Sequence, residues 1–237
     1  MESRCRWTAD GSRNDGATAG LAAMKTLSLE QAAALVPDGA SVMIGGFMGV
    51  GTPERLIDEL VRRGTGGLTV IANDTAMAGV GIGKLISAGL VRRAIVSHIG
   101  LNPETQKQMI AGKTDVDLVP QGTLIERIRA GGYGLGGILT ATGVGTVVEE
   151  GKPTLTLDGK KFLVERALRA DFALVNAFLA DYRGNLTYAL TARNFNPVIA
   201  TAADTVIVDA ENIVPTGVIP PDHVMTPAPL VDYLVAH

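Results

Sequence analysis

The sequence contains little that could support disulfide or metal chemistry. Cys5 is the only cysteine among 237 residues, which excludes an intrachain disulfide. The three histidines, His98, His223 and His237, lie far apart and lack the spacing typical of metal ligands. We therefore expect no metal site, and a chain without disulfides fits the reducing cytoplasm.

Aromatic residues and clustered positive charge are also scarce. Aromatic side chains make up 4% of the chain, too few for the stacking surfaces on which proteins bind single-stranded bases. The formal net charge is −3, and the basic residues form no stripe of the kind that nucleic-acid binding requires. No apolar run approaches the roughly 18 residues of a membrane-spanning helix. We thus expect neither a nucleic acid nor a membrane as a partner.

What the chain does contain is a regular alternation of apolar and amphipathic segments. Hydrophobic residues account for 46% of it, enough for a sizeable core. Strands are expected at residues 42–44, 68–72, 94–98, 116–119, 173–177 and 205–208, and helices at 54–63, 83–88, 103–111 and 123–130. This order predicts the α/β class, with an open, mostly parallel twisted sheet flanked by helices.

The first 23 residues differ in texture from the rest. They are rich in Gly, Ala, Ser, Arg and Asp and show no helical or strand periodicity. After Met24, Ser28 is expected to cap a helix, so Met24 is the expected working start. We interpret residues 1–23 as a disordered extension and residues 24–237 as one domain without a sharp internal boundary.

The most informative segment is residues 38–53. An apolar strand at 42–44 runs into a turn made of Gly45, Gly46, Phe47, Met48, Gly49, Val50 and Gly51. Thr52 is expected to cap the following helix. Missing Cβ atoms let a ligand approach the backbone, and a helix N-terminus offers N–H donors to an anion. The segment predicts a site for a phosphate, carboxylate or thioester, although such turns also occur without ligands and this one matches no nucleotide motif.

Two side-chain amides follow other expected strands. Asn73 ends the strand at 68–72, and Gln121 follows the strand at 116–119. Ligands of open parallel sheets lie beyond the carboxyl ends of the strands, so these residues and the glycine-rich turn become candidates together. Asn73 could donate a hydrogen bond to an oxyanion, and Gln121 could bind a substrate carboxylate. Each is also a typical turn residue, and for Asn73 the turn interpretation is favoured by the residues alone.

The second half of the chain carries fewer chemical signals. Residues 131–151 contain eight glycines, which excludes a regular helix and favours a long functional loop or a surface covered by another chain. Within them Glu149 and Glu150 form an adjacent acid pair, which we interpret as solvated. Residues 155–163 predict a hairpin with its turn at 158–159. Residues 193–197 predict a binding loop or the entry to a helix.

Residues 38–53 resemble the first signature of the family I CoA-transferases. That signature is Asp-Gly, two free positions, three apolar residues, Gly-Gly-Phe, three free positions, Gly, one free position and Pro, and every fixed position is filled. Blocks at 71–76, 119–124, 129–132, 142–146 and 192–196 are similar to that family as well. The resemblance runs from about residue 24 to the end and is strongest to the α subunits of bacterial acetate/acetoacetate CoA-transferases.

The resemblance implies an enzyme made of two kinds of chain. In the family a glutamate attacks acyl-CoA and forms an acyl anhydride and then a glutamyl-CoA thioester, from which a second carboxylate takes the CoA. That glutamate belongs to a Ser-Glu-Asn-Gly motif of the β subunit, and the motif is absent here. The resemblance therefore implies a β partner, an α2β2 assembly, a cytoplasmic location, and CoA, acyl-CoA and small carboxylic acids as substrates, with no permanently bound cofactor.

The resemblance also assigns roles to particular residues. The turn at 45–51 would contact CoA, Asn73 would stabilise the oxyanion, Gln121 would contact the acid substrate, and the nucleophilic glutamate would lie outside this chain. The glycine-rich residues 131–146 would suit close contact with the β chain. Two alternatives stay open: a stand-alone sugar-phosphate isomerase of the related fold, which would need its own carboxylate, or a non-enzymatic CoA-binding module.

Overall fold

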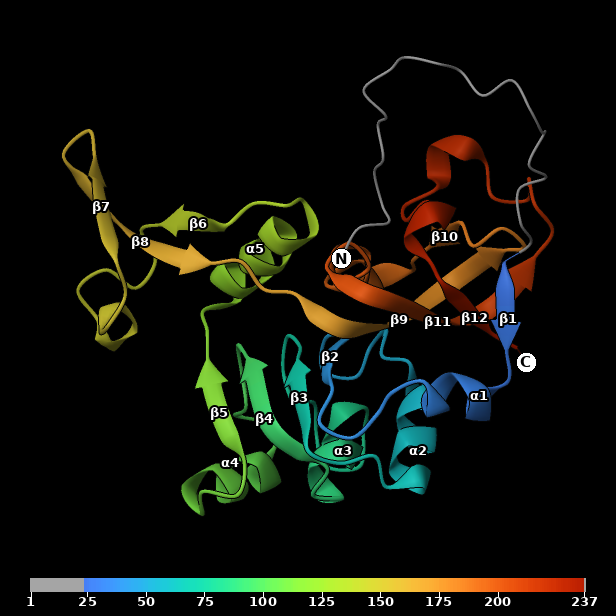
Figure 1. Cartoon of the computed structure of the whole chain (residues 1–237), viewed down its shortest axis with the longest axis horizontal. Helices are drawn as coiled ribbons and strands as arrows, with labels where there is room; N and C mark the ends of the chain where they lie inside the picture. The colour runs from blue at the N-terminus through green and yellow to red at the C-terminus, as the bar shows by residue number, and fades with distance from the viewer. Residues whose placement is uncertain (1–23, 237) are drawn as a thin grey trace, which may run out of the picture.

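The computed structural model describes residues 24–236, and the interpretation of residues 1–23 lies outside that range (Figure 1). Eight strands of the main sheet follow the order β1-β12-β11-β9-β2-β3-β4-β5, and β10 pairs with β9. Every pair along that path is parallel, whereas β10 runs antiparallel to β9. The predicted α/β class with a mostly parallel sheet is confirmed.

Most elements of this body lie close to their predicted positions, but three short strands, at residues 25–27, 186–187 and 233–235, were not predicted. Its strands are β1 (Lys25–Leu27), β2 (Ser41–Ile44), β3 (Leu68–Ile71), β4 (Val91–Val96), β5 (Asp115–Leu118), β9 (Ala170–Asp181), β10 (Leu186–Thr187), β11 (Ala203–Val214) and β12 (Tyr233–Val235). Its helices are α1 (Leu29–Ala34), α2 (Glu54–Arg63), α3 (Ile82–Ser87), α4 (Pro103–Ile110), α5 (Gln121–Gly132) and α6 (Asn196–Ile199). The strands β9 and β11 are much longer than expected because they pair with each other along their whole length.

Two hydrophobic cores cover the two faces of the main sheet. Side chains alternate along a strand, so β2 sends Val42 and Ile44 to one core and Met43 to the other. The first core also contains apolar residues of α1, α2 and α3, and the second contains those of α5 and α6. A sheet buried on both faces explains why its strands read as unbroken apolar runs.

A separate three-stranded sheet extends beside α5 (Figure 1). We call residues 137–166 the arm; its strands are β6 (Gly137–Thr140), β7 (Thr154–Leu157) and β8 (Lys160–Arg166), with the short 3-10 helix η1 (Val147–Glu149) between the first two. The predicted hairpin is confirmed, and Asp158 and Gly159 at its turn both have positive φ. The interpretation of residues 131–151 as one long loop is wrong, because the segment contains the end of α5, β6 and η1.

The helix ends test several local predictions. Ser28 caps α1 by accepting from the Gln31 N–H, as predicted. Thr52 does not cap α2; Pro53 precedes that helix, and no side chain caps its first turn. The Thr52 side chain points elsewhere: it packs against Gly46, so closely that a Cβ added at Gly46 would collide with it. Three 3-10 helices follow later in the chain: η2 (Leu190–Arg193), η3 (Pro221–His223) and η4 (Ala228–Leu230).

Candidate active site at the carboxyl ends of β2 and β3

The glycine-rich turn follows β2 at the carboxyl edge of the main sheet. Phe47 and Val50 exchange backbone hydrogen bonds of 2.9 Å in both directions, which closes a tight turn around Met48 and Gly49. Met48 has a φ of 50°, a conformation that is uncommon for a residue with a side chain. The turn therefore presents backbone at the sheet edge in a strained and fixed form.

The glycines of this turn are needed for packing inside the chain. A Cβ at Gly45 would collide with the Asn196 side chain, and a Cβ at Gly51 would lie 2.7 Å from Cα of Ala192. Asn196 donates from Nδ2 to the carbonyls of Gly51 (2.8 Å) and Ala192 (3.0 Å), and it also opens α6. Residues 193–197 are thus the entry to a helix, one of the two predicted alternatives, and that helix buttresses the turn.

The N-terminus of α2 is electrostatically less favourable for an anion than predicted. A small pocket of about 310 Å³ lies there, and its charged lining residues are Glu54, Arg55, Asp209 and Glu211. Arg55 is ion-paired with the buried carboxylate of Asp209 and is therefore not free to neutralise a ligand. Two of the three carboxylates there are ion-paired, Asp209 with Arg55 and Glu54 with Lys84, so they reduce the predicted benefit of the helix N-terminus without cancelling it.

Asn73 and Gln121 meet directly, although β4 lies between the strands β3 and β5 that they follow. Gln121 Nε2 donates to Asn73 Oδ1 at 2.6 Å. Ser97, at the end of β4, donates from Oγ to the Asn73 carbonyl at 2.7 Å and from its N–H to the same carbonyl at 2.9 Å. Asn73 is buried, with 2% of its surface exposed. Gln121 is the first residue of α5, so the interpretation of Gln121 as a turn residue is wrong.

A buried carboxylate that sequence reasoning passed over links the amides to the glycine-rich turn. Asp74 Oδ2 accepts from the Met48 N–H at 2.9 Å and from Asn73 Nδ2 at 2.7 Å, and its Oδ1 accepts from the Ala76 N–H at 2.7 Å. Asp74, not Asn73, therefore makes the local turn contact. The sequence did contain a signal for this role, because Asp74 directly follows the candidate amide Asn73 at the end of a strand.

The acid pair of the arm lies outside this network. Glu149 ends η1, where its carboxylate is ion-paired with Lys161 and accepts from the Gly145 N–H at 2.7 Å. The Lys161 hydrogen bond, followed by the Gly145 bond, lowers the pKa of Glu149. The expectation that this pair is solvated holds for Glu150, which is exposed, but not for Glu149.

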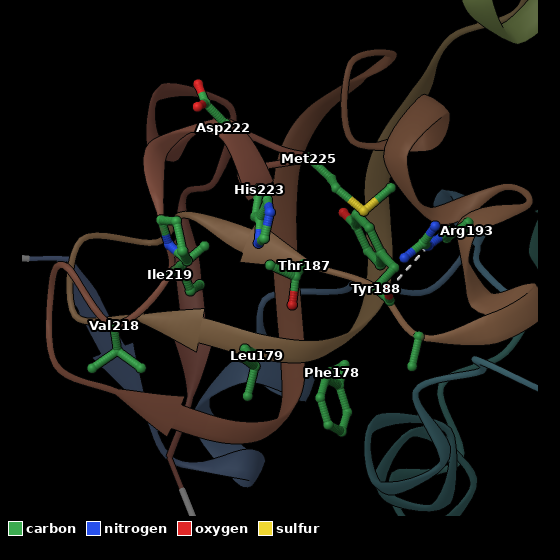
Figure 2. Close-up of a pocket in the computed structure, with 12 residues that line it drawn as sticks. Phe178, Leu179, Thr187, Tyr188, Arg193, Val218, Ile219, Asp222, His223 and Met225 are labelled. Atoms are coloured by element: carbon green, nitrogen blue, oxygen red, sulfur yellow. Dashed lines mark hydrogen bonds between the residues drawn. The ribbon is translucent and has the colours of Figure 1, made fainter.

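A larger pocket of about 600 Å³ opens near the ends of β9 and β10 (Figure 2). Its lining residues are Phe178, Leu179, Thr187, Tyr188, Ala189, Arg193, Val218, Ile219, Pro220, Asp222, His223 and Met225. Figure 2 shows His223 and Thr187 near its centre, with Asp222 directed away. Burial raises the pKa of the Tyr188 phenol, which stays neutral beside Thr226. Sequence reasoning missed this pocket because its walls come from several distant segments.

Residues 24–236 contain neither a metal-binding cluster nor a membrane-spanning helix. In that range no group of three or more histidine, cysteine, aspartate or glutamate side chains is arranged to hold a metal ion. Within the same range, every helix is too short or too polar to cross a bilayer. The polar groups at the strand ends include the amides of Asn73 and Gln121, the hydroxyl of Ser97 and the buried carboxylate of Asp74.

Comparison of the sequence with known proteins identifies relatives of this chain. The coenzyme A transferase family matches residues 26–237. Acetate CoA-transferase subunit alpha of Escherichia coli K12 is 58% identical over 211 residues, which cover 89% of this chain and 96% of that protein. The alpha subunit of the acetoacetyl-CoA:acetate/butyrate CoA transferase of Clostridium acetobutylicum is 47% identical over 211 residues, covering 89% of this chain and 97% of that protein.

A solved structure supports the same fold. The acyl-CoA transferase of Escherichia coli O157:H7, crystallised as a thioester complex with CoA, superposes with a TM-score of 0.79 at 24% identity. The match covers 91% of this chain and 47% of that protein, so this chain spans about half of its length. Together with the family match over nearly all described residues, these relatives show that the chain belongs to the coenzyme A transferase family.

Proposed function

We propose that this chain is the α subunit of a CoA-transferase that moves CoA from an acyl-CoA to a short-chain carboxylate or 3-oxo acid. The proposal includes a β subunit that supplies the nucleophilic glutamate, an α2β2 assembly and a cytoplasmic location. It rests on relatives 58% and 47% identical that are named as alpha subunits of such enzymes and are covered almost completely.

The reaction balances without ATP. The partner's glutamate carboxylate attacks the acyl-CoA carbonyl, the C–S bond breaks, and CoA leaves as a thiolate, which produces an acyl-glutamyl anhydride. The thiolate then attacks the glutamyl carbonyl, which releases the first acid as a carboxylate and leaves a glutamyl-CoA thioester. The acceptor carboxylate reverses these steps, so that the acceptor leaves as its CoA thioester and the glutamate is restored.

This chain would contribute positioning and oxyanion stabilisation. Each attack places negative charge on a carbonyl oxygen, and preorganised donors in a site that excludes water stabilise that charge. We assign this role to the amide of Asn73 and the contact with the acid substrate to Gln121. The backbone of the turn at residues 45–51 would lie against CoA, and a cleft between two chains would bury that long ligand from both sides.

One observation carries this assignment. Asn73 and Gln121 are 48 positions apart, yet their amides meet at 2.6 Å at the same sheet edge, and Asp74 ties them to the glycine-rich turn. An arrangement of linked amide donors without a nucleophile is what a chain needs if the attacking carboxylate comes from another subunit. The alternative isomerase is disfavoured, because Glu149 is ion-paired on the arm outside this network, and Asp74, the carboxylate within it, already accepts three hydrogen bonds from this chain.

The test compares the chain alone with the chain purified together with a subunit that carries Ser-Glu-Asn-Gly. We expect transfer of CoA from acetyl-CoA to acetoacetate or butyrate only from the mixture. Mass spectrometry of the mixture incubated with acyl-CoA should find the CoA adduct on the partner's glutamate. Transferase activity of the chain alone, or a CoA adduct on one of its own glutamates, would contradict the proposal.

The two alternatives give different results in the same experiment. A sugar-phosphate isomerase would convert its substrate without a partner and would lose activity on a Glu149→Gln or Glu150→Gln change. A CoA-binding module would bind CoA alone and gain nothing from the partner. The mass of the purified complex, measured by light scattering, decides whether the assembly is α2β2.

A further inference from the structure

Asp74 is a buried carboxylate with an unusual set of donors. It is 5% exposed and accepts three hydrogen bonds, from the Met48 N–H, the Asn73 side-chain amide and the Ala76 N–H. Two of these donors belong to residues with positive φ, 50° at Met48 and 51° at Ala76. One carboxylate therefore holds two strained backbone positions, one on the glycine-rich turn and one after β3.

The charge of Asp74 also fixes the direction of a chain of hydrogen bonds. A carboxylate only accepts, so Asn73 must turn Nδ2 toward it and Oδ1 away from it. Oδ1 then faces Gln121, which must present Nε2 as the donor, as the 2.6 Å contact shows. In this arrangement each amide keeps one N–H beyond its intramolecular bond.

We propose that Asp74 is a positioning residue of the transfer reaction: it holds the Asn73 amide in one orientation and, through it, that of Gln121. The inference rests on the proposed function, in which these two amides serve as donors to developing or existing negative charge. If either amide turned over, a carbonyl oxygen would face the substrate's oxygen, and the stabilisation would become repulsion.

The first test is Asp74→Asn in the complex with the β subunit. The change keeps the size of the side chain, but an amide has one acceptor oxygen, so one of the backbone N–H groups of Met48 and Ala76 must face an NH2 group. When the lost acceptor is the one shared by Met48 and Asn73, the Asn73 amide is also driven to turn over. We expect kcat to fall about 10- to 100-fold, below the roughly 100- to 1000-fold effect of removing an oxyanion donor itself.

Asp181 supplies a matched control. It is 2% exposed and accepts from the backbone N–H groups of Arg183 (2.9 Å) and Asn185 (3.0 Å) and from Asn185 Nδ2 (2.8 Å). Its donors thus have the same types as those of Asp74, but they form a turn after β9. Asp181→Asn should lower the melting temperature to a similar extent and leave kcat unchanged. An equal loss of kcat in both variants would mean that Asp74 is only structural.

A double-mutant cycle separates positioning from stability. If Asp74 acts through the Asn73 side chain, Asp74→Asn should cost under about 3-fold in kcat once Asn73→Ala has removed that side chain. The KM for acyl-CoA should stay within about 3-fold of wild type in the single variant. Independent, multiplicative effects of the two substitutions would overturn the inference.

A second variant keeps the inference testable if Asp74→Asn does not fold. Gln121→Glu preserves the shape of an exposed side chain but turns the donor to Asn73 Oδ1 into an acceptor, and it should reduce kcat at least 10-fold. Retained kcat in Gln121→Glu contradicts the proposed direction of the hydrogen bonds, as does retained kcat in an Asp74→Asn complex whose crystal structure shows the Asn73 amide turned over. An inactive wild-type complex would instead contradict the proposed function.

Discussion

The main sheet and the arm contain similar apolar residues but bury them to very different extents. In β2, three of four residues are buried, whereas all four residues of β7 are exposed. Helices cover both faces of the main sheet, but the arm has little of its own to pack against. Its buried Leu163 lies near the buried carboxylate of Glu165, which is paired with Lys152 at 2.6 Å and Arg127 at 3.7 Å.

This difference in burial indicates that different interactions stabilise the main sheet and the arm. The free energy of the main body comes mainly from apolar burial, while the arm is attached by polar contacts around one buried acid. We therefore expect the arm to open locally at a lower free energy than the main body unfolds. The predicted contact of residues 131–146 with a β chain stays a prediction, and the experiments below address the contrast between the two regions.

The largest contrast should come from the same substitution in both regions. Leu60 in α2 is fully buried, and Leu155 in β7 is 45% exposed. Leu60→Ala should lower the free energy of unfolding by about 2–5 kcal/mol, because it leaves a cavity in the core. Leu155→Ala should change it by less than about 0.5 kcal/mol. Urea denaturation measures both, and equal costs would refute the contrast.

Alanine at tightly packed glycines should reveal how rigid each region is. A Cβ added at Gly51 (φ 74°) would lie 2.7 Å from the Ala192 Cα, while a Cβ added at Gly143 (φ 91°) would lie 2.7 Å from Cγ1 and 2.9 Å from Cβ of Val148. Both changes strain the left-handed backbone, but Ala192 is buried in the main body, whereas Val148 is only half-buried on the arm and can shift more easily. Gly51→Ala should cost about 2–4 kcal/mol and Gly143→Ala about 1–2 kcal/mol. Thermal unfolding of both variants would show whether this order holds.

Removing the polar anchor should loosen the arm alone. Glu165→Gln keeps the shape of the side chain but leaves Lys152 and Arg127 without a charged partner. We expect a loss of about 1–3 kcal/mol in the free energy of local opening, seen as faster hydrogen exchange at the amides of β6 and β8. Unchanged exchange in β2 and β3 is the internal control, and uniform acceleration everywhere would argue against separate units.

The smallest effect concerns acid sensitivity. The Ser41 hydroxyl and N–H, which donate to Asp171 at 2.7 and 2.8 Å, lower the pKa of that carboxyl in the main body. A lowered folded-state pKa gives stability that is present above the unfolded value, roughly 3.9, and is lost as pH falls through the folded one. Asp171→Asn should therefore flatten the loss of global stability below about pH 4.

Glu149 offers the corresponding acid on the arm. The Lys161 hydrogen bond lowers the pKa of Glu149. Its contribution to stability is therefore also lost as the pH falls through the folded-state pKa. Glu149→Gln should change the acid sensitivity of hydrogen exchange in the arm and leave the urea midpoint of the main body unaffected. A shift of the global midpoint equal to that of Asp171→Asn would show that the arm and the body unfold together.

Sequence reasoning succeeded where the signal is local or periodic. The helices at residues 54–63 and 103–110, the cap at Ser28 and the turn at 158–159 follow from residues close to each other in the chain. The placement of Asn73 and Gln121 at one edge of the sheet was also predictable, because parallel strands end there, but their direct hydrogen bond was not, since β4 lies between their strands. The prediction of a cap at Thr52 was wrong, because its side chain instead fills the space that Gly46, six residues earlier, leaves open by lacking a Cβ.

The amino-acid sequence by itself determined the fold class, the family resemblance and the two candidate amides, since each depends on spacing within short segments. Only the tertiary structure decided that Asp74 joins Met48 to Asn73, that Asn196 packs against Gly45, and that an arm leaves the body beside α5. The physical reason is that a buried hydrogen bond between distant residues depends on where the sheet and helices place both partners, which no local pattern specifies.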